Sequence, residues 1–548
     1  MPKITGARAI VEVFKEEGIS HVFHLPGSQI LDILDEIYQS PIKPVMARHE
    51  QGAAFMADGY ARATRGVGVC MSTVGPGAMN LVAGIASSYK ASVPVLAITG
   101  VHQQKILERD SFHEIDQVAV FKPITKWSVC INQPEKIPEM LRKAFRMALT
   151  GRKGPVHLAI PSNVSEGEIE FKESEPSKYR TVIPPACSEE FVDQVGKLLE
   201  SAKFPLLYVG GEVLWSKAGK NLVELAETLG TPVATTRDHP DAFPNMHSLG
   251  MGMIGKGRGE AGNRVMKQAD LNQALGVKFD YQSTRHNFDI IPEKAKIVHV
   301  SINPEEVGRV YPIELGIVCD VGSVIRELLR TVKERKIHFD LKKEIEEIKR
   351  DSQKVRDSEI EPKALPLKPQ VIARTVRDLL PPDAVVVVDG GNFAKSIRRH
   401  FDFYQNDTFH YPDEFGAVGA SFPMALGVKV ANPGRPVVCM IGDGGFLLNS
   451  QDLETAVREG INIIVVIFND SGFGNVRAYQ KEKYGGRYMC DFDNPPYAEM
   501  ARLFKTDGAQ VERLEDLKKA IHTGLKSRKL FVIDVKMDRE ELQKPGFL

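Results

Sequence analysis

Short runs of consecutive apolar residues alternate with amphipathic segments along the whole chain. The runs at 93–100 (VPVLAITG), 437–441 (VVCMI) and 463–468 (IIVVIF) have the length of strands that are buried on both faces. The segment 4–18 (ITGARAIVEVFKEEG) instead places apolar residues at helical spacing. This alternation predicts parallel sheets covered by helices on both faces.

Two stretches, at 170–190 and 350–370, are rich in proline and charge and lack apolar periodicity, which is typical of linkers. The chain has 548 residues, more than one hydrophobic core can organise. We therefore expect an α/β protein with three doubly wound parallel-sheet domains, at 1–175, 188–345 and 365–548.

The composition excludes several classes of protein. Lys plus Arg and Asp plus Glu both number 71, so no overall field favours nucleic acid or an anionic membrane. No apolar run reaches the roughly 18 residues of a membrane span, and the first segment has the pattern of a folded helix rather than of a signal peptide. The six cysteines are scattered singly, as in reduced proteins. We expect a cytoplasmic protein with no nucleic-acid or membrane partner.

Two acidic strand ends carry the main chemical pattern. One predicted strand runs into GDGG at 442–445, and the next ends at Asn469 and Asp470. A helix between them, capped by Asn449 or Ser450, would make the strands neighbours and bring Asp443 and Asp470 to one edge of the sheet. Two carboxylates, a carbonyl and a diphosphate suit Mg²⁺, and glycines let backbone N–H groups approach phosphates.

A simpler interpretation is that Asp443 caps a helix and that Asn469 and Asp470 form a turn. The combination of GDGGF, a helix of suitable length and an acidic strand end favours the metal and diphosphate site.

This pattern resembles the fingerprint of thiamine diphosphate-dependent enzymes, which opens with GDG and closes with an Asn pair after the next strand. The likeness is to acetolactate synthases and extends over almost the whole chain, with HLPGSQ at 24–29, STVGPGAMNL at 72–81 and RKGPVHLAIP at 152–161. Asp470 stands where the second Asn is usual, as in acetolactate synthases of the catabolic type.

The resemblance implies a set of site residues. Asp443, Asp470 and the carbonyl of Gly472 are expected to bind Mg²⁺. Thiamine diphosphate is expected to contact Pro26, Gly27, Glu50, Gly75, Asn80, Gly391, Asn392, Val418, Gly442, Asp443, Gly444, Gly445, Asp470, Phe473 and Gly474. Val418 matches the apolar residue beneath the cofactor, although plain core packing would also explain it.

Glu50 follows an extended segment and begins an alanine-rich helix. By itself it could be a first-turn acid favoured by the helix dipole. In the family, the Glu of the RHEQGAA motif bonds the pyrimidine ring and helps the cofactor's amine to deprotonate the thiazolium carbon. Family geometry places this Glu and the diphosphate site in different subunits. We therefore expect a homodimer or homotetramer, and leave a regulatory subunit open.

Several departures from the biosynthetic enzymes concern the substrate. The expected substrate pocket comprises Phe112, His113, Val476 and Tyr479, and His113 is also a candidate catalytic residue because His can relay protons near neutral pH. Tyr479 stands where a Trp favours 2-oxobutyrate. Gln282 replaces an Arg associated with substrate or flavin, which argues against FAD without excluding it.

Three functional hypotheses follow. The first is a thiamine diphosphate and Mg²⁺-dependent decarboxylating carboligase on 2-oxo acids, forming 2-acetolactate from pyruvate. The second is a related lyase or decarboxylase acting on a 2-hydroxyacyl-CoA or oxalyl-CoA, with an adenine nucleotide group in the central domain. The third is a non-catalytic nucleotide-binding or regulatory protein. Glu50, Asp443 and Asp470 argue against the third, because packing requires none of them.

Overall fold

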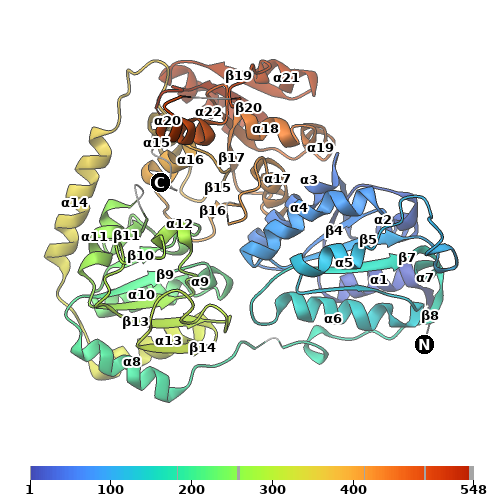
Figure 1. The fold of residues 1–548 in the computed structure, drawn as a ribbon, viewed down its shortest axis with the longest axis horizontal. Helices are drawn as coiled ribbons and strands as arrows, with labels where there is room; N and C mark the ends of the chain where they lie inside the picture. The colour runs from blue at the N-terminus through green and yellow to red at the C-terminus, as the bar shows by residue number, and fades with distance from the viewer. Residues whose placement is uncertain (1, 182, 256–258, 413, 487–488, 542–548) are drawn as a thin grey trace.

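The computed structural model describes residues 2–181, 183–255, 259–412, 414–486 and 489–541. They form three α/β domains, each built on one six-stranded sheet whose paired strands are all parallel (Figure 1). The predicted fold class is confirmed. None of the helices in these described ranges combines the length and apolar character needed to cross a membrane.

The first domain has the strand order β3-β2-β4-β5-β7-β6. Its strands are β2 (His21–His24), β3 (Lys43–Met46), β4 (Gly68–Ser72), β5 (Val95–Val101), β6 (Trp127–Cys130) and β7 (Val156–Pro161). Its helices are α1 (Gly6–Glu16), α2 (Leu31–Tyr38), α3 (Glu50–Thr64), α4 (Pro76–Ala91), α5 (Gln117–Phe121), α6 (Ile137–Leu149) and α7 (Ser162–Glu166). The expected first helix is α1, which begins where Thr5 accepts a hydrogen bond from the Arg8 amide and which buries Ile10 and Phe14.

A short antiparallel pair, β1 (Lys3–Thr5) with β8 (Glu168–Glu170), closes the first domain. The sequence pattern did not predict it, because three-residue strands are too short to show a period.

The central domain has the order β11-β10-β9-β12-β13-β14. Its strands are β9 (Pro205–Val209), β10 (Val233–Thr235), β11 (Gly250–Met253), β12 (Leu271–Leu275), β13 (Lys296–Ser301) and β14 (Leu315–Val318). Its helices are α8 (Glu189–Ser201), α9 (Glu212–Trp215), α10 (Gly219–Leu229), α11 (Glu260–Gln268), α12 (Tyr281–Thr284), α13 (Val321–Arg335) and α14 (Lys342–Ser358). The order reverses between β9 and β12, the place where such sheets open a crevice.

The third domain has the order β16-β15-β17-β18-β20-β19. Its strands are β15 (Val385–Val388), β16 (Phe409–His410), β17 (Val437–Gly442), β18 (Ile464–Asn469), β19 (Asp507–Val511) and β20 (Phe531–Lys536). Its helices are α15 (Pro369–Leu379), α16 (Phe393–His400), α17 (Ser421–Ala431), α18 (Asp443–Asn449), α19 (Asp452–Arg458), α20 (Gly474–Tyr484), α21 (Tyr497–Leu503) and α22 (Leu514–Lys526). Every residue of β15 and β18 is buried, as their continuous apolar runs predict.

Residues 350–358 of the second predicted linker are helical and belong to α14 (Lys342–Ser358). This helix runs along one edge of the molecule between the central and third domains (Figure 1). It buries Ile345 and Ile348 against the central core but is otherwise strongly charged. So narrow an apolar stripe resembles a polar linker in sequence.

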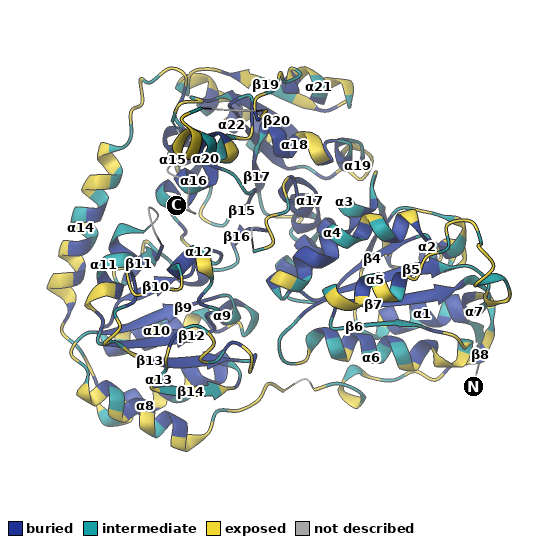
Figure 2. Cartoon of the chain, in the orientation of Figure 1, coloured by how far each residue is buried: buried dark blue, intermediate teal, exposed yellow. Residues whose placement is uncertain are grey.

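The first and third domains meet along α3 and α17. A Cβ at Gly59 would lie 2.2 Å from the Met424 carbonyl oxygen, and a Cβ at Gly427 would lie 1.9 Å from that of Met56. The two backbones therefore cross in direct contact, and both helices are largely buried there (Figure 2). This crossing fixes the first domain against the third.

Candidate active site

The two predicted metal-binding aspartates follow neighbouring strands. β17 and β18 pair in parallel from Val438 with Ile464 to Gly442 with Phe468. Asp443 comes directly after β17 and Asp470 directly after β18, and they are 1% and 7% exposed. The side-by-side strands predicted from the sequence are present.

The intervening helix differs from the prediction. α18 begins at Asp443 itself and ends at Asn449, and α19 follows from Asp452 without a side-chain cap. Asn449 does not cap a helix; its amide donates to the Gly419 carbonyl at 3.0 Å. The long apolar and polar pattern thus contains two short helices rather than one.

The carboxylate of Asp443 gathers donors from three segments. Oδ1 accepts from the Gly444 amide at 2.9 Å, and Oδ2 accepts from the Gly472 amide at 3.3 Å and from Asn494 Nδ2 at 2.7 Å. These contacts hold the loop after β18 against the end of β17. Gly472, the third predicted metal ligand, therefore lies beside Asp443.

A buried arginine, Arg477, binds the carboxylate of Asp470. Its Oδ2 accepts from Arg477 Nη1 at 2.6 Å, and Arg477 also donates to Asp491 Oδ1. Burial and then the charge of Asp443 raise the pKa of Asp470 to about 7. Burial likewise raises the pKa of Asp443. Two buried carboxylates that disfavour each other's charge are stabilised by a divalent cation.

The donor set fits Mg²⁺ with a diphosphate. Within the described ranges no group of three or more His, Cys, Asp or Glu residues could hold a metal ion. Two carboxylates and a carbonyl leave further positions for phosphate oxygens and water, which is how Mg²⁺ is usually bound. The site suits a metal bound together with an anionic cofactor.

The glycine-rich loops of the third domain converge on this pair. A Cβ at Gly474 would lie 2.7 Å from Asp470 Oδ2 and 3.5 Å from the Cβ of Asn392. Gly391 and Gly442 both face the ring of Phe393, at 2.5 and 3.2 Å from their built Cβ positions. A side chain at these positions would fill the space, so the loops expected to face the diphosphate do lie together.

The segment around Val418 is tied to a buried acid. Asp389 accepts from the amides of Gly419 at 2.9 Å and Ser421 at 3.3 Å. Gly419 has φ +82° and lies against the Gly445 carbonyl, so a glycine is required there. Val418 itself is 43% exposed. Plain core packing does not explain it, because its side chain is left open in the single chain.

Glu50 is buried rather than a solvated first-turn acid. It begins α3, is 5% exposed, and its Oε2 accepts from Asn80 Nδ2 on α4 at 2.9 Å. A Cβ at Gly77 would lie 3.0 Å from its Oε1. The end of α4 therefore surrounds this carboxylate.

The other predicted site residues of the first domain lie around the N-terminal end of α4. Gly27, after the exposed Pro26, packs on Thr73, which also contacts Gly77. Gly75 has φ +64°, and its built Cβ would lie 2.2 Å from the His113 carbonyl oxygen. Phe112 and His113 stack at 3.6 Å between ring centroids and are both exposed. His113 is thus available to a ligand.

The first-domain and third-domain candidates form two separate groups. Among the contacts that connect the domains, the Arg48 amide donates to Asp452 Oδ1 at 2.9 Å, and Gly52 packs on the same carboxylate. None of these three is a predicted site residue. In the third-domain group, Phe473 and Val476 are exposed, and Tyr479 is half-buried on α20.

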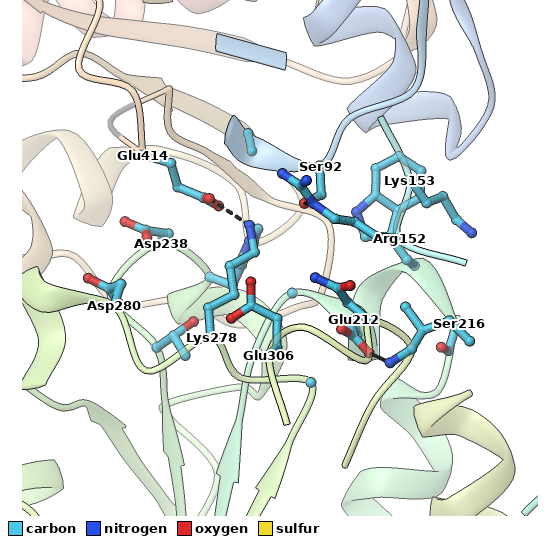
Figure 3. A pocket seen from close by; sticks show the side chains of 18 of the residues that line it. Ser92, Arg152, Lys153, Glu212, Ser216, Asp238, Lys278, Asp280, Glu306 and Glu414 are labelled. Carbon is cyan, nitrogen blue, oxygen red and sulfur yellow. Dashed lines mark hydrogen bonds and ion pairs between the residues drawn. The ribbon is translucent and has the colours of Figure 1, made fainter. Parts of the chain in front are cut away.

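The crevice of the central sheet contains a cavity of about 110 Å³. Figure 3 shows its acidic lining, with Lys278 pointing to Glu414, whose Oε2 lies 2.7 Å from Nζ. Glu212 accepts from Ser301 Oγ at 2.6 Å and from the Ile302 amide at 2.8 Å, and burial raises its pKa. This cavity alone is smaller than the roughly 300 Å³ of a small cofactor pocket, and it shares Asp238, Lys278 and Glu306 with a larger cavity beside it.

Three residues of the site escaped the sequence analysis: Asp389, Arg477 and Asn494. Asn494 also donates to Asn469 Oδ1 at 2.9 Å and accepts from Tyr497 at 2.7 Å, so it links both strand ends. It lies in a loop without a motif, and no sequence pattern marks it. Arg477 was detectable only as the first basic residue after Asp470, seven positions along the chain.

The comparisons with known proteins agree along the chain. The thiamine pyrophosphate enzyme N-terminal TPP binding domain matches residues 4–120, the central domain 192–328, and the C-terminal TPP binding domain 389–535. The probable acetolactate synthase large subunit of Methanocaldococcus jannaschii is 33% identical over 98% of this chain and 92% of its own length. The acetolactate synthase large subunit of Haemophilus influenzae is 32% identical over 99% and 96%.

The acetolactate synthase of Arthrospira platensis is 34% identical over 98% of this chain and 95% of that protein. Identity at this level over the full length of both chains establishes the family. The chain belongs to the thiamine diphosphate-dependent enzymes and is an enzyme of the acetolactate synthase-like type.

Proposed function

We propose that this enzyme is a Mg²⁺-dependent decarboxylating carboligase that forms 2-acetolactate from pyruvate. The observation that carries the proposal is the pair of buried carboxylates at neighbouring strand ends, Asp443 and Asp470, with the Gly472 loop beside them. The names of the similar proteins support the acetolactate synthase reaction.

Asp443, Asp470 and the Gly472 carbonyl would hold Mg²⁺, and the loops at Gly391, Asn392 and 442–445 would receive the diphosphate. When bound, thiamine diphosphate supplies the nucleophilic carbon that adds to a 2-oxo acid. The protein's part is to position that cofactor and to exclude water, for which the exposed Val418 offers an apolar contact.

Glu50 would hold a proton at the pyrimidine nitrogen. Its carboxylate is buried, so it is oriented by Asn80 rather than by solvent. Such a positioned carboxyl can pass a proton to and from the cofactor's ring without leaving its place.

A homodimer or homotetramer would complete the site. Around the two groups of predicted residues, large apolar side chains are exposed in the single chain: Phe112, Ile115, Phe415, Val418, Leu447, Leu448, Phe473 and Val476. Exposed apolar side chains beside both groups are typical of a subunit contact. We propose that Glu50 of one protomer faces the diphosphate site of its partner. Because two of the similar proteins are named large subunits, a regulatory subunit is a further proposed partner.

We propose that the reaction needs no flavin, since Gln282 stands where the similar enzymes have an Arg associated with substrate or flavin. The acyl-CoA lyase hypothesis is kept as an alternative, because a second cavity of about 850 Å³ adjoins the crevice and is rich in basic side chains. It is large enough for a nucleotide group.

The deciding experiment supplies the apoprotein with thiamine diphosphate, Mg²⁺ and ¹³C-labelled pyruvate. Labelled 2-acetolactate and carbon dioxide are the expected products, read by NMR. Cleavage of a 2-hydroxyacyl-CoA without acetolactate would select the alternative. Absence of cofactor binding by calorimetry would contradict both.

A further inference from the structure

The cavity of about 850 Å³ lies where the three domains meet, with lining residues from each. One part of its wall is Gly391, in the loop after β15, and Asn475, at the start of α20 beside Gly474, which faces Asp470. Another part is formed by Arg237, Arg398 and Tyr411. The cavity therefore connects the proposed diphosphate site with a group of guanidinium side chains.

Arg398 is the unusual member of this group. It lies on α16 and is 4% exposed, and its Nε and Nη1 atoms are buried without a hydrogen-bond partner among the described residues. Its Cζ lies 4.7 Å from the ring centroid of the buried Tyr411. The Cζ of Arg237 lies 5.7 Å from the same ring. Two cations thus share one aromatic ring.

Three carboxylates of the lining are already paired with other basic side chains. Asp238 lies 2.7 Å from Arg237, Glu414 lies 2.7 Å from Lys278, and Glu306 lies 2.7 Å from Arg309. A cation–π contact contributes about 0.5–2 kcal/mol, whereas the desolvation of a buried ion costs several kcal/mol. The ring therefore does not compensate the burial of the Arg398 guanidinium.

Arg399, the next residue on α16, has hydrogen-bond partners for its guanidinium. Arg399 points to Glu359, which accepts from its Nε at 2.7 Å and also from Nη2. Arg398 faces the cavity instead. An anionic group that enters the cavity would compensate the charge of its guanidinium.

We propose that Arg398 binds an anionic group of the substrate, a carboxylate or a phosphate at the end away from the reacting carbon. Its guanidinium is a fixed positive charge whose N–H groups can bond the oxygens of such a group. This inference rests on the proposed function, since the reacting end is placed at the Asp443 and Asp470 site. It adds that the site also accepts, besides pyruvate, a substrate that carries a second anion beyond the 2-oxo acid.

The test measures binding by calorimetry to the protein loaded with thiamine diphosphate and Mg²⁺. The probes are 2-oxoglutarate for a distal carboxylate, ADP for a phosphate, and pyruvate for a ligand with no second anion. Arg398→Gln should weaken binding of 2-oxoglutarate or ADP by about tenfold or more, since a charged hydrogen bond is lost. Pyruvate binding should change less than about twofold.

Arg399→Gln is the matched control, because it removes the same charge at the next residue. This variant should bind all three probes with the affinity of the wild type. Arg398→Lys should give an intermediate affinity and guards against misfolding of the Gln variant, with melting temperatures compared throughout. If only the binding of 2-oxoglutarate depends on Arg398, the bound group is a carboxylate. If only the binding of ADP depends on it, the bound group is a phosphate. Either result supports the site. Equal binding of both probes to wild type and Arg398→Gln would overturn it.

The inference and the proposed function fail separately. Acetolactate formation by a protein whose anion binding ignores Arg398 would remove the inference and leave the function. Arg398-dependent binding in a protein that makes no acetolactate would do the reverse.

Discussion

Asn494 Nδ2 lies 2.7 Å from Asp443 Oδ2 and 2.9 Å from Asn469 Oδ1. One amide group thus joins the ends of β17 and β18, the two strands that carry the proposed metal ligands. It orients the Asp443 carboxylate without being a ligand itself.

Asn494→Ala should weaken Mg²⁺ binding in the presence of thiamine diphosphate by about 10–100-fold, the usual effect of removing a hydrogen-bond partner of a metal ligand. Calorimetric titration with Mg²⁺ measures it. Asn432→Ala, which removes an amide bonded to the Val428 carbonyl, is the control. Unchanged Mg²⁺ affinity in Asn494→Ala would show that Asp443 is oriented by other contacts.

Asp443→Ala should abolish the joint stabilisation by metal and cofactor. In the wild type, Mg²⁺ with thiamine diphosphate should raise the melting temperature, because ligands that bind only the folded state stabilise it. The variant should show almost none of that rise, whereas Asp507→Ala, at an exposed position, should keep it. A full rise in Asp443→Ala would place the ion elsewhere.

Glu50→Gln should separate cofactor binding from proton transfer. The amide can still accept the hydrogen bond from Asn80, so thiamine diphosphate should bind with affinity near that of the wild type. Exchange of the thiazolium proton with deuterated solvent should slow by about 10²–10⁴-fold, the usual contribution of a positioned acid or base. NMR follows the exchange, with the exposed Glu139→Gln as control. An unaltered exchange rate would contradict the role of Glu50 in proton transfer.

Gly427→Ala should strain the crossing of α3 and α17. The new methyl group would lie 1.9 Å from the Met56 carbonyl oxygen, and neither backbone can yield without moving a helix. The free energy of unfolding should fall by about 1–3 kcal/mol or more. Gly434→Ala, which has open space around its Cβ, is the matched control. Equal melting temperatures for the two variants would mean that the helices can separate at little cost.

Asp452 should give the stability a specific dependence on pH. Burial raises its pKa to about 6, above the value of about 3.9 in an unfolded chain. Between these values the folded state holds more protons than the unfolded state, so this group's contribution to stability is greatest below pH 4. It is lost as the pH rises through about 6, by about 3 kcal/mol.

Asp452→Asn removes that titration. The free energy of unfolding of the wild type relative to the variant should therefore decline from pH 4 to pH 6 and stay level above. Urea unfolding across this pH range measures the difference in the free energy of unfolding between the two proteins. The other titrating groups are present in both, so their contributions cancel. A difference that is constant over the range would show that Asp452 keeps an ordinary pKa.

The chain's own pattern determined the fold class and much of the site. Continuous apolar runs such as β15 and β18 can only be buried on both faces, and GDGG after one run with an acid after the next identifies a shared sheet edge. Local periodicity carries this information because it depends on neighbours in sequence.

Only the tertiary structure decided which distant groups meet. Asn494 reaches Asp443 across 51 positions, Gly427 meets Met56 between domains, and α14 proves helical although its apolar stripe is narrow. The buried Nε and Nη1 atoms of Arg398, which have no hydrogen-bond partner among the described residues, likewise cannot be predicted from the sequence. Such features depend on which side chains and backbones approach in space, and a hydrogen bond or a buried charge is set by that approach and not by spacing along the chain.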